Sequence, residues 1–269
     1  MNANKKAMSQ NYFSVEGKVV VVTGGCGQLG RQFTRALVEA GARVAVFDVA
    51  ACEVNRDAVL MVEADVTSRS SLEAGLNAVI AKWGVPDALI NNAGLDSPPD
   101  APIEETGPFE SYPESSWDKV MQVNTKGVFL CCQVIGGAMA QAGRGSIVNI
   151  GSIYGLISPD QRIYDYRRTK GEQFFKPVAY SVSKSSLLNL TRYLATYWAG
   201  SKVRVNTLTL AGVFNNQDEQ FLKSYTAHVP LGRMAEPSEY NGAIIFLVSD
   251  ASAYMTGANM VMDGGWTAW

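Results

Sequence analysis

The feature that most constrains the fold is a repeated alternation of short apolar stretches with longer stretches that have helical spacing. Residues 18–23 read KVVVVT, and residues 43–48 read RVAVFD. Continuous apolar runs of this length are typical of strands that are buried on both faces. Five further strands are expected at residues 58–63, 87–91, 146–150, 204–208 and 260–262, with helical stretches at 29–40, 68–83, 117–141, 178–198 and 237–249.

This alternation predicts an α/β fold of the Rossmann type, a doubly wound parallel sheet of seven strands with helices on both faces. The 269 residues suit one domain, which we expect over residues 12–269 after a flexible tail at 1–11. The ligand crevice of such a sheet lies beyond the carboxyl ends of its strands. Long loops are expected at 95–115 and 155–177, and loops of that length are usually functional.

Composition and charge argue against several classes of partner. Lys and Arg total 23 against 25 Asp and Glu, for a net charge of -2. This balance argues against nucleic acid or an anionic membrane as the main partner. No apolar run reaches the roughly 18 residues of a membrane-spanning helix, and the first residues lack the apolar core of a signal peptide. We therefore expect a cytoplasmic protein that binds a small molecule.

The four cysteines are Cys26, Cys52, Cys131 and Cys132, and the sequence contains no CxxC motif. Their spacing predicts neither a metal site nor a disulfide framework, and it is typical of proteins in a reducing cytosol. Cys26 is interpreted as a small packing residue, with a redox-sensitive thiol at a helix start as the alternative.

The end of the first predicted strand has the layout of a dinucleotide site. Residues 23–30 read TGGCGQLG, so Gly24, Gly27 and Gly30 stand between a strand and a helix. Glycines let the backbone approach a pyrophosphate, and a helix N-terminus offers N–H donors; a tight structural turn is the alternative. Asp48 ends the second strand, where a carboxylate accepts hydrogen bonds from the ribose hydroxyls of NAD and repels the extra phosphate of NADP. This favours NAD.

Further motifs follow along the chain: Asp65-Val66, Asn91-Asn92-Ala93-Gly94, Asn124, Ser152, YSVSK at 180–184 and DGG at 263–265. Over residues 14–265 the chain thereby resembles the single-domain short-chain dehydrogenase/reductases. The resemblance implies a homotetramer or homodimer and a catalytic set of Asn124, Ser152, Tyr180 and Lys184. It also implies a set of NAD contacts: Gly24, Gly27, Gln28, Leu29, Gly30, Asp48, Asp65, Val66, Asn92, Gly94, Tyr180, Lys184 and Val213.

Two departures from the family pattern affect the cofactor end. Gln28 stands where the single-domain members usually have a glycine, which predicts an altered phosphate turn. The usual Pro-Gly after the sixth strand is replaced by Leu210-Ala211, so the contact of Val213 with the nicotinamide is less defined.

Two tyrosine–lysine pairs match YxxxK, Tyr166–Lys170 and Tyr180–Lys184. The first is closer to the usual distance from Ser152, but a Tyr and a Lys four apart face the same way only on a helix. A long helical stretch follows Tyr180, whereas Gly171 and Pro177 follow Tyr166. We therefore assign Tyr180 and interpret residues 159–177 as an insertion.

The expected chemistry is hydride transfer between NAD(H) and a secondary alcohol or ketone. Tyr180 exchanges the proton, Lys184 favours its phenolate, Ser152 holds the substrate oxygen, and Asn124 positions a water. The insertion carries an excess of basic over acidic side chains, which predicts an anionic or polyhydroxylated substrate such as a sugar or sugar acid. Its charges are Arg162, Arg167, Arg168, Lys170 and Lys176 against Asp160, Asp165 and Glu172.

Two other functions remain open at this point. A non-catalytic NAD-binding sensor would not need the four catalytic residues, and a dehydratase or epimerase using NAD transiently has only the TGxxGxxG spacing in its favour. The lone His228 is interpreted as structural, and Trp266 and Trp269 as interface residues. No metal site is expected.

Overall fold

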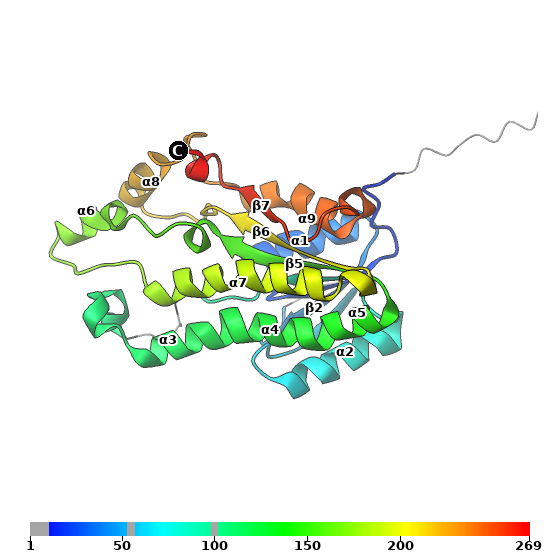
Figure 1. Ribbon diagram of the computed structural model, residues 1–269. Coiled ribbons are helices and arrows are strands. Elements are labelled where there is room, and N and C mark those ends of the chain that lie inside the picture. The colour runs from blue at the N-terminus through cyan, green and yellow to red at the C-terminus, as the bar shows by residue number, and fades with distance from the viewer. Residues whose placement is uncertain (1–10, 53–56, 98–101) are drawn as a thin grey trace, which may run out of the picture.

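The alternating apolar stretches form one parallel sheet. The computed structural model describes residues 11–52, 57–97 and 102–269, and in these ranges seven strands pair in the order β3-β2-β1-β4-β5-β6-β7 (Figure 1). The predicted α/β class and the seven-stranded sheet are confirmed, while residues 1–10 of the predicted tail lie outside the described residues. The strands are β1 Val19–Thr23, β2 Arg43–Asp48, β3 Val59–Glu63, β4 Ala88–Asn91, β5 Gly145–Ser152, β6 Val203–Leu210 and β7 Asn259–Met262.

Each face of the sheet has its own apolar core because successive side chains of a strand point to opposite faces. In β1, Val19 and Val21 belong to one cluster, and Val20 and Val22 belong to the other. The first cluster continues into α2 (Arg69–Trp83), α4 (Val128–Cys131) and α7 (Val178–Tyr197), and the second into α1 (Gln28–Glu39) and α9 (Asn241–Val248). Figure 1 shows the two groups of helices on opposite sides of the sheet.

The long helix expected at 117–141 spans Glu114 to Ala142 and is interrupted by two wider turns. It consists of α3 (Glu114–Met121), α4 and α5 (Gly137–Ala142), joined by π-helical segments at Gln122–Gly127 and Cys132–Gly136. Such segments inside α-helices are frequent at functional sites, and the first one contains Asn124.

Two short helices lie where the sequence predicted only loops. The insertion contains the 3₁₀ turn Gln161–Tyr164 and α6 (Asp165–Arg168), and α8 (Glu219–Thr226) follows β6. The side chain of Asp218 caps α8 by accepting hydrogen bonds from the backbone N–H groups of Gln220 and Phe221. Further 3₁₀ turns lie at Ile103–Thr106, Phe109–Ser111, Ile153–Gly155, Ala199–Ser201, Pro237–Tyr240, Asp250–Ser252 and Trp266–Ala268.

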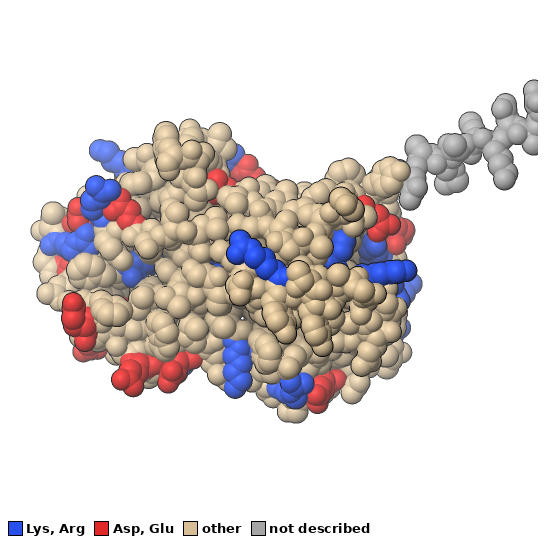
Figure 2. All heavy atoms as spheres, viewed as in Figure 1, with Lys and Arg blue, Asp and Glu red and all other residues tan. Residues whose placement is uncertain are grey.

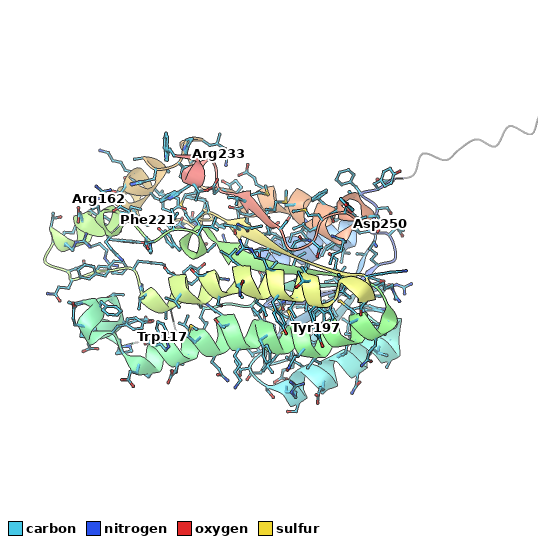
Figure 3. The ribbon with its side chains drawn as sticks, in the orientation of Figure 1. Trp117, Arg162, Tyr197, Phe221, Arg233 and Asp250 are labelled. Carbon is cyan, nitrogen blue, oxygen red and sulfur yellow. A yellow bond between two sulfur atoms is a disulfide. The ribbon has the colours of Figure 1, made fainter. Side chains whose placement is uncertain are left out.

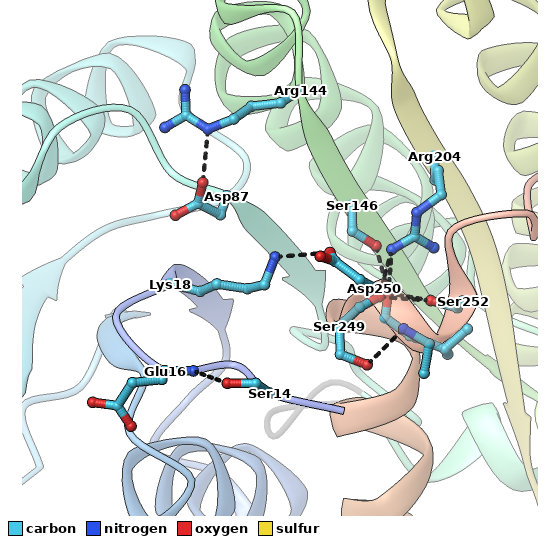
Figure 4. A network of polar contacts seen from close by, with 12 residues as sticks. Ser14, Glu16, Lys18, Asp87, Arg144, Ser146, Arg204, Ser249, Asp250 and Ser252 are labelled. Atoms are coloured by element: carbon cyan, nitrogen blue, oxygen red, sulfur yellow. Dashed lines mark hydrogen bonds and ion pairs between the residues drawn. The ribbon is translucent and has the colours of Figure 1, made fainter. Parts of the chain in front are cut away.

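Polar side chains tie the amino ends of the strands together, away from the predicted crevice (Figure 4). Asp87 accepts a hydrogen bond from the backbone N–H of Val19 at 2.9 Å and forms an ion pair with Arg144 at 2.8 Å. Arg204 donates to the backbone carbonyl of Leu247 at 2.9 Å. On the face shown in Figure 2, acidic and basic side chains are scattered over a largely uncharged surface. In the described residues no helix is long and apolar enough to span a membrane.

Candidate active site

A cavity of about 1070 Å³ lies at the carboxyl ends of β1, β2, β4, β5 and β6. It brings together most of the residues singled out from the sequence, from both the cofactor and the catalytic sets. Those lining it are Gly24, Gly27, Gln28, Leu29, Asp48, Val66, Asn92, Gly94, Ser152, Tyr180, Lys184 and Val213. Gly30, Asp65 and Asn124 are not part of the lining.

The glycine turn requires its glycines for two different physical reasons. Gly24 has a φ of +61°, and a Cβ there would lie 2.7 Å from Ala93 Cα. A Cβ on Gly30 would lie 2.6 Å from Gly25 Cα, so Gly30 permits the close packing of α1 against the turn. Gly27 is the N-cap of α1 and makes no side-chain cap. No side chain caps the first turn of α1, and Gln28 and Leu29 of that turn line the cavity, an arrangement that suits an anion such as a pyrophosphate.

Gln28, the departure from the family pattern, is the first residue of α1. Its Nε2 donates to the backbone carbonyl of Phe214 at 2.8 Å. Phe214 follows β6, and its N–H donates to the carbonyl of Ala235 at 2.8 Å. The side chain thus links the glycine turn to the loop that contains Val213, a contact that a glycine at this position could not make.

Asp48 lies at the end of β2, beside the glycine turn. Its Oδ2 accepts from the N–H of Cys26 at 2.9 Å, and its Oδ1 accepts from the N–H of Ala50 at 3.0 Å. The carboxylate is therefore fixed at the cavity wall, where it fits the ribose hydroxyls of a dinucleotide. Asp65 is exposed instead, and its Oδ1 accepts from the N–H and the hydroxyl of Thr67 at 2.8 and 2.7 Å.

The prediction that the cysteines form no disulfide is wrong for one pair. Cys26 and Cys52 are joined by a disulfide, with their Cα atoms 5.7 Å apart. The two residues are distant in sequence, but β1 and β2 are neighbouring parallel strands, so the segments that follow their carboxyl ends lie side by side. Cys131 and Cys132 are free and buried.

Ser152, Tyr180 and Lys184 meet where β5 ends and α7 begins. Ser152 is the last residue of β5, and its Oγ accepts from the N–H of Tyr154 at 3.2 Å. Lys184 lies one helical turn after Tyr180, with its Nζ 5.8 Å from the centre of the tyrosine ring. Nζ donates to the carbonyl of Ile150 at 2.8 Å. The helix expected after Tyr180 therefore aligns the pair on one face, as the spacing predicted.

Burial controls the ionisation of this pair. It lowers the pKa of Lys184 to about 8, although the Asp96 carboxylate acts in the opposite direction. Burial also raises the pKa of Tyr180 above its usual value; Asp96 adds to this rise, and a hydrogen bond with Ser152 opposes it. The sequence argument expected Lys184 to lower the pKa of Tyr180. In the structure the loss of hydration is the largest influence, and it raises the pKa of Tyr180 instead.

Asn124 connects α7 to the loop after β4. Its Oδ1 accepts from the N–H of Leu95 at 2.7 Å, and its Nδ2 donates to the carbonyl of Leu95 at 2.7 Å and to Ser183 Oγ at 3.0 Å. A Cβ on Gly94 would lie 3.4 Å from Asn124 Oδ1 and 3.5 Å from Lys184 Nζ. The amide of Asn124 therefore positions backbone around Lys184, and its expected role in holding a water stays a prediction.

Asn92 ties the end of β4 to the glycine turn. Its Nδ2 donates to the carbonyls of Thr23 at 3.0 Å and Gly24 at 2.9 Å. The predicted cofactor path thus has one rigid wall, built from the ends of two adjacent strands.

The alternative pair, Tyr166 and Lys170, does not share a helix, because only Tyr166 belongs to α6. α6 ends at Arg168, and Lys170 Nζ is 5.7 Å from the Tyr166 ring. Tyr166 lines the cavity, as Tyr180 does.

Most of the basic side chains of the insertion pair with acidic ones. Arg162 contacts Asp160 at 2.7 Å, and Arg167 contacts Glu172 at 2.7 Å. Arg168 pairs with Asp165, and Lys176 reaches Asp96 in the loop after β4. The excess of positive charge that the charge count predicted for the insertion is therefore largely neutralised by ion pairs.

The substrate end of the cavity has an aromatic wall that the sequence reading did not identify. Tyr154, Tyr164, Phe174, Phe221 and Tyr225 line the cavity. The Tyr164 and Phe174 rings are 4.8 Å apart, and those of Phe221 and Tyr225 are 5.4 Å apart. The aromatic residues at 154–174 and 221–225 could have indicated this wall in the sequence. That both groups line one cavity depends on α8, which the sequence did not predict.

The insertion packs against α8, where the Tyr164 and Phe221 rings are 5.9 Å apart. Figure 3 labels Arg162 and Phe221, which belong to these two segments. His228 joins the two segments: its Nε2 lies 3.2 Å from Asp160 Oδ2, and its ring stacks on Trp266 at 5.1 Å. These contacts fit the structural role inferred for His228. Trp266 is buried within the chain, which argues against its expected role at an interface, whereas Trp269 is exposed.

Comparison with known proteins gives matches over nearly the whole chain. Residues 27–267 match the family described as enoyl-(acyl carrier protein) reductase. D-threitol dehydrogenase of Mycolicibacterium smegmatis is 32% identical, with 95% of each chain covered. A short chain dehydrogenase from Leptospira borgpetersenii with bound NAD+ is 32% identical with a TM-score of 0.86, covering 99% of this chain and 100% of that one. A gluconate 5-dehydrogenase from Burkholderia cenocepacia in complex with NADP and tartrate is 25% identical with a TM-score of 0.83, covering 96% and 98%.

Proposed function

The chain belongs to the short-chain dehydrogenase/reductase family, and from this premise we propose that it is an NAD(H)-dependent dehydrogenase of a polyol or sugar-like substrate. The observation that carries the proposal is the convergence of Ser152, Tyr180 and Lys184 in the cavity that also contains the glycine turn and Asp48. A protein that only binds NAD would need the glycine turn and Asp48, but not Ser152, Tyr180 and Lys184.

Each protein group has a defined part in the proposed reaction. The nicotinamide of bound NAD would supply or accept the hydride. Tyr180 Oη donates a proton to a ketone oxygen in the reducing direction and removes it from a hydroxyl in the oxidising direction. Ser152 Oγ holds that oxygen by a hydrogen bond. The buried ammonium of Lys184 stabilises the phenolate that remains after proton donation.

The residues at the cofactor end support NAD over NADP. The Asp48 carboxylate is fixed by two backbone N–H groups at the wall beside the glycine turn. A fixed carboxylate accepts hydrogen bonds from ribose hydroxyls and repels a phosphate at the same position. Binding isotherms measured separately with NAD and with NADP give the two dissociation constants and test this preference directly.

The aromatic wall supports a compact, hydroxylated substrate. Rings such as Phe174 and Phe221 pack against the C–H faces of a polyol or sugar, while the hydroxyls of Tyr154 and Tyr164 provide polar edges. The relative that acts on D-threitol agrees with this class. Because most of the basic side chains of the insertion are paired, a neutral polyol fits the cavity without a negative charge.

The test is NADH formation in the presence of a panel of polyols, sugars and sugar acids. Net NADH formation with at least one secondary alcohol is expected, and with NADP the rate should be lower. Product formation without net NADH would instead favour a dehydratase or epimerase, for which the altered turn at Gln28 is the relevant observation. NAD binding with no product on the whole panel would support the sensor.

We also propose that the protein assembles as a homotetramer or homodimer and that it is located in the cytoplasm. Light scattering of the purified protein tests the first, and fractionation of cells tests the second.

A further inference from the structure

The disulfide lies at the adenosine end of the proposed cofactor site. Cys26 belongs to the glycine turn and lines the cavity, and Cys52 follows Asp48 by four residues. The Asp48 carboxylate lies between the two segments and accepts a backbone hydrogen bond from each, from Cys26 and from Ala50. The covalent bond therefore joins two walls of the same binding site.

The segment after Asp48 is exposed at Val49 and Ala50 and packs against the second apolar core through Cys52. Val49 is 70% exposed, although it lines the cavity. Besides that packing, the segment makes the Ala50 N–H bond to Asp48, a 3.3 Å approach of Cys26 Sγ to the Ala50 carbonyl, and a 4.0 Å approach of Cys52 Sγ to Met61 Sδ. Without the disulfide, this wall loses its side-chain cross-link to the glycine turn.

We propose that Cys26 and Cys52 form a redox-modification site that sets the affinity for NAD, with the disulfide form binding the dinucleotide more tightly than the dithiol form. This inference rests on the proposed NAD site but not on the proposed substrate. The disulfide holds the segment after Asp48 in place before the ligand arrives, so binding has less chain to order.

The reacting partner is a dithiol in one direction and a low-molecular-weight disulfide in the other. Reduction breaks the Sγ–Sγ bond, places one hydrogen on each cysteine sulfur and converts the dithiol to its disulfide, with transfer of two electrons and two protons. Oxidation reverses this step through a mixed disulfide on one of the two cysteines, which the second thiol then displaces.

The chemistry is selective for this pair among the four cysteines. Cys131 and Cys132 are buried, and burial raises the pKa of both thiols, in the case of Cys132 to about 12. A thiol reacts as its thiolate, so these two residues react slowly with the same reagents. Cys26 and Cys52 are both partly exposed.

The experiment compares NAD binding to the oxidised and the reduced protein by calorimetry, without any substrate. The protein is treated with oxidised glutathione or with dithiothreitol, and the state of each cysteine is read by alkylation and peptide mass. Reduction is expected to raise the dissociation constant for NAD about tenfold, the factor for ordering about one further backbone residue. Cys52→Ser should bind NAD as the reduced protein does and should not respond to dithiothreitol.

Three results would overturn the proposal. One is equal affinity of the two forms for NAD, another is tighter binding after reduction, and the third is failure of oxidised glutathione to join Cys26 to Cys52. In each of these cases the proposed dehydrogenase could still be correct. Absence of NAD binding in both forms would instead contradict the proposed cofactor itself, and this inference would fall with it.

Discussion

Lys184 should reduce the stability of the protein at neutral pH, although it is placed to support the chemistry. Only 6% of the residue is exposed, and burial lowers its pKa from the usual 10.5 to about 8. A lysine whose pKa is lower in the folded state carries a penalty at every pH where the folded form is charged. Since each pKa unit corresponds to about 1.4 kcal/mol, this penalty is about 3 kcal/mol at neutral pH.

The substitution Lys184→Met removes this charge and also the donor to the Ile150 carbonyl, whose loss costs about 1–2 kcal/mol. The variant should therefore be about 1–2 kcal/mol more stable than the wild type near pH 7. Above about pH 8 the folded wild type releases the proton while the unfolded chain keeps it, so wild-type stability rises with pH. The advantage of the variant should fall by about 2 kcal/mol between about pH 7 and about pH 9.5.

Urea unfolding of both proteins at the two pH values measures this difference. Lys126→Met, at an exposed lysine, is the matched control and should show no comparable gain. A Lys184→Met protein that is less stable than the wild type near neutral pH, or a difference that does not change with pH, would refute the reasoning.

Three further substitutions test other parts of the structure. Asp48→Ala should weaken NAD binding about tenfold or more, because hydrogen bonds to a charged group are worth about 1.5–3 kcal/mol. It should also reduce the difference between the affinities for NAD and NADP. Calorimetry measures both affinities, and an unchanged affinity for NAD would contradict the assignment. Gln28→Gly removes the link to Phe214 and should speed NADH release in stopped-flow fluorescence, whereas an unchanged rate would mean that the link does not hold the site closed. Asp87→Ala breaks the ion pair with Arg144 and leaves a backbone N–H without its acceptor, so it should lower the free energy of unfolding by about 1–3 kcal/mol while NAD affinity stays the same.

The strands were predictable because burial on both faces leaves a plain signal in the sequence. Residues 43–48 were predicted as a strand and form β2 with the same bounds. The strand expected at 146–150 extends to Ser152, because Ser152 pairs in register with Leu210 of β6. Pairing across strands decides where a strand ends, and a single stretch of sequence does not contain that information.

The choice of Tyr180 over Tyr166 also came from local sequence, since the long helical stretch after Tyr180 determines which pair shares a helix face. The ionisation of the pair could not be predicted in this way. The sequence shows a lysine near a tyrosine, but it does not show that both lose hydration, and that loss sets the direction of both pKa shifts.

The disulfide and the paired charges of the insertion were misjudged for a related reason. Both depend on which segments lie side by side, as Cys52 and Cys26 do across neighbouring strands, and as Lys176 and Asp96 do across the cavity. Counting cysteines or charges along the chain gives their number but not their partners. Predicting the aromatic wall would also have required predicting α8. That helix is too short for the spacing of its apolar residues to reveal it in the sequence.

The central claim is that Tyr180 transfers the proton in an NAD-dependent reaction, and the most direct measurement compares turnover with NAD affinity in Tyr180→Phe. The account predicts that this variant binds NAD as the wild type does and loses at least about 100-fold in kcat, as expected when a general acid–base group is removed. Tyr166→Phe, the matched control on the insertion, should retain most of its turnover. Near-normal turnover in Tyr180→Phe, or loss of turnover in Tyr166→Phe alone, would contradict the account.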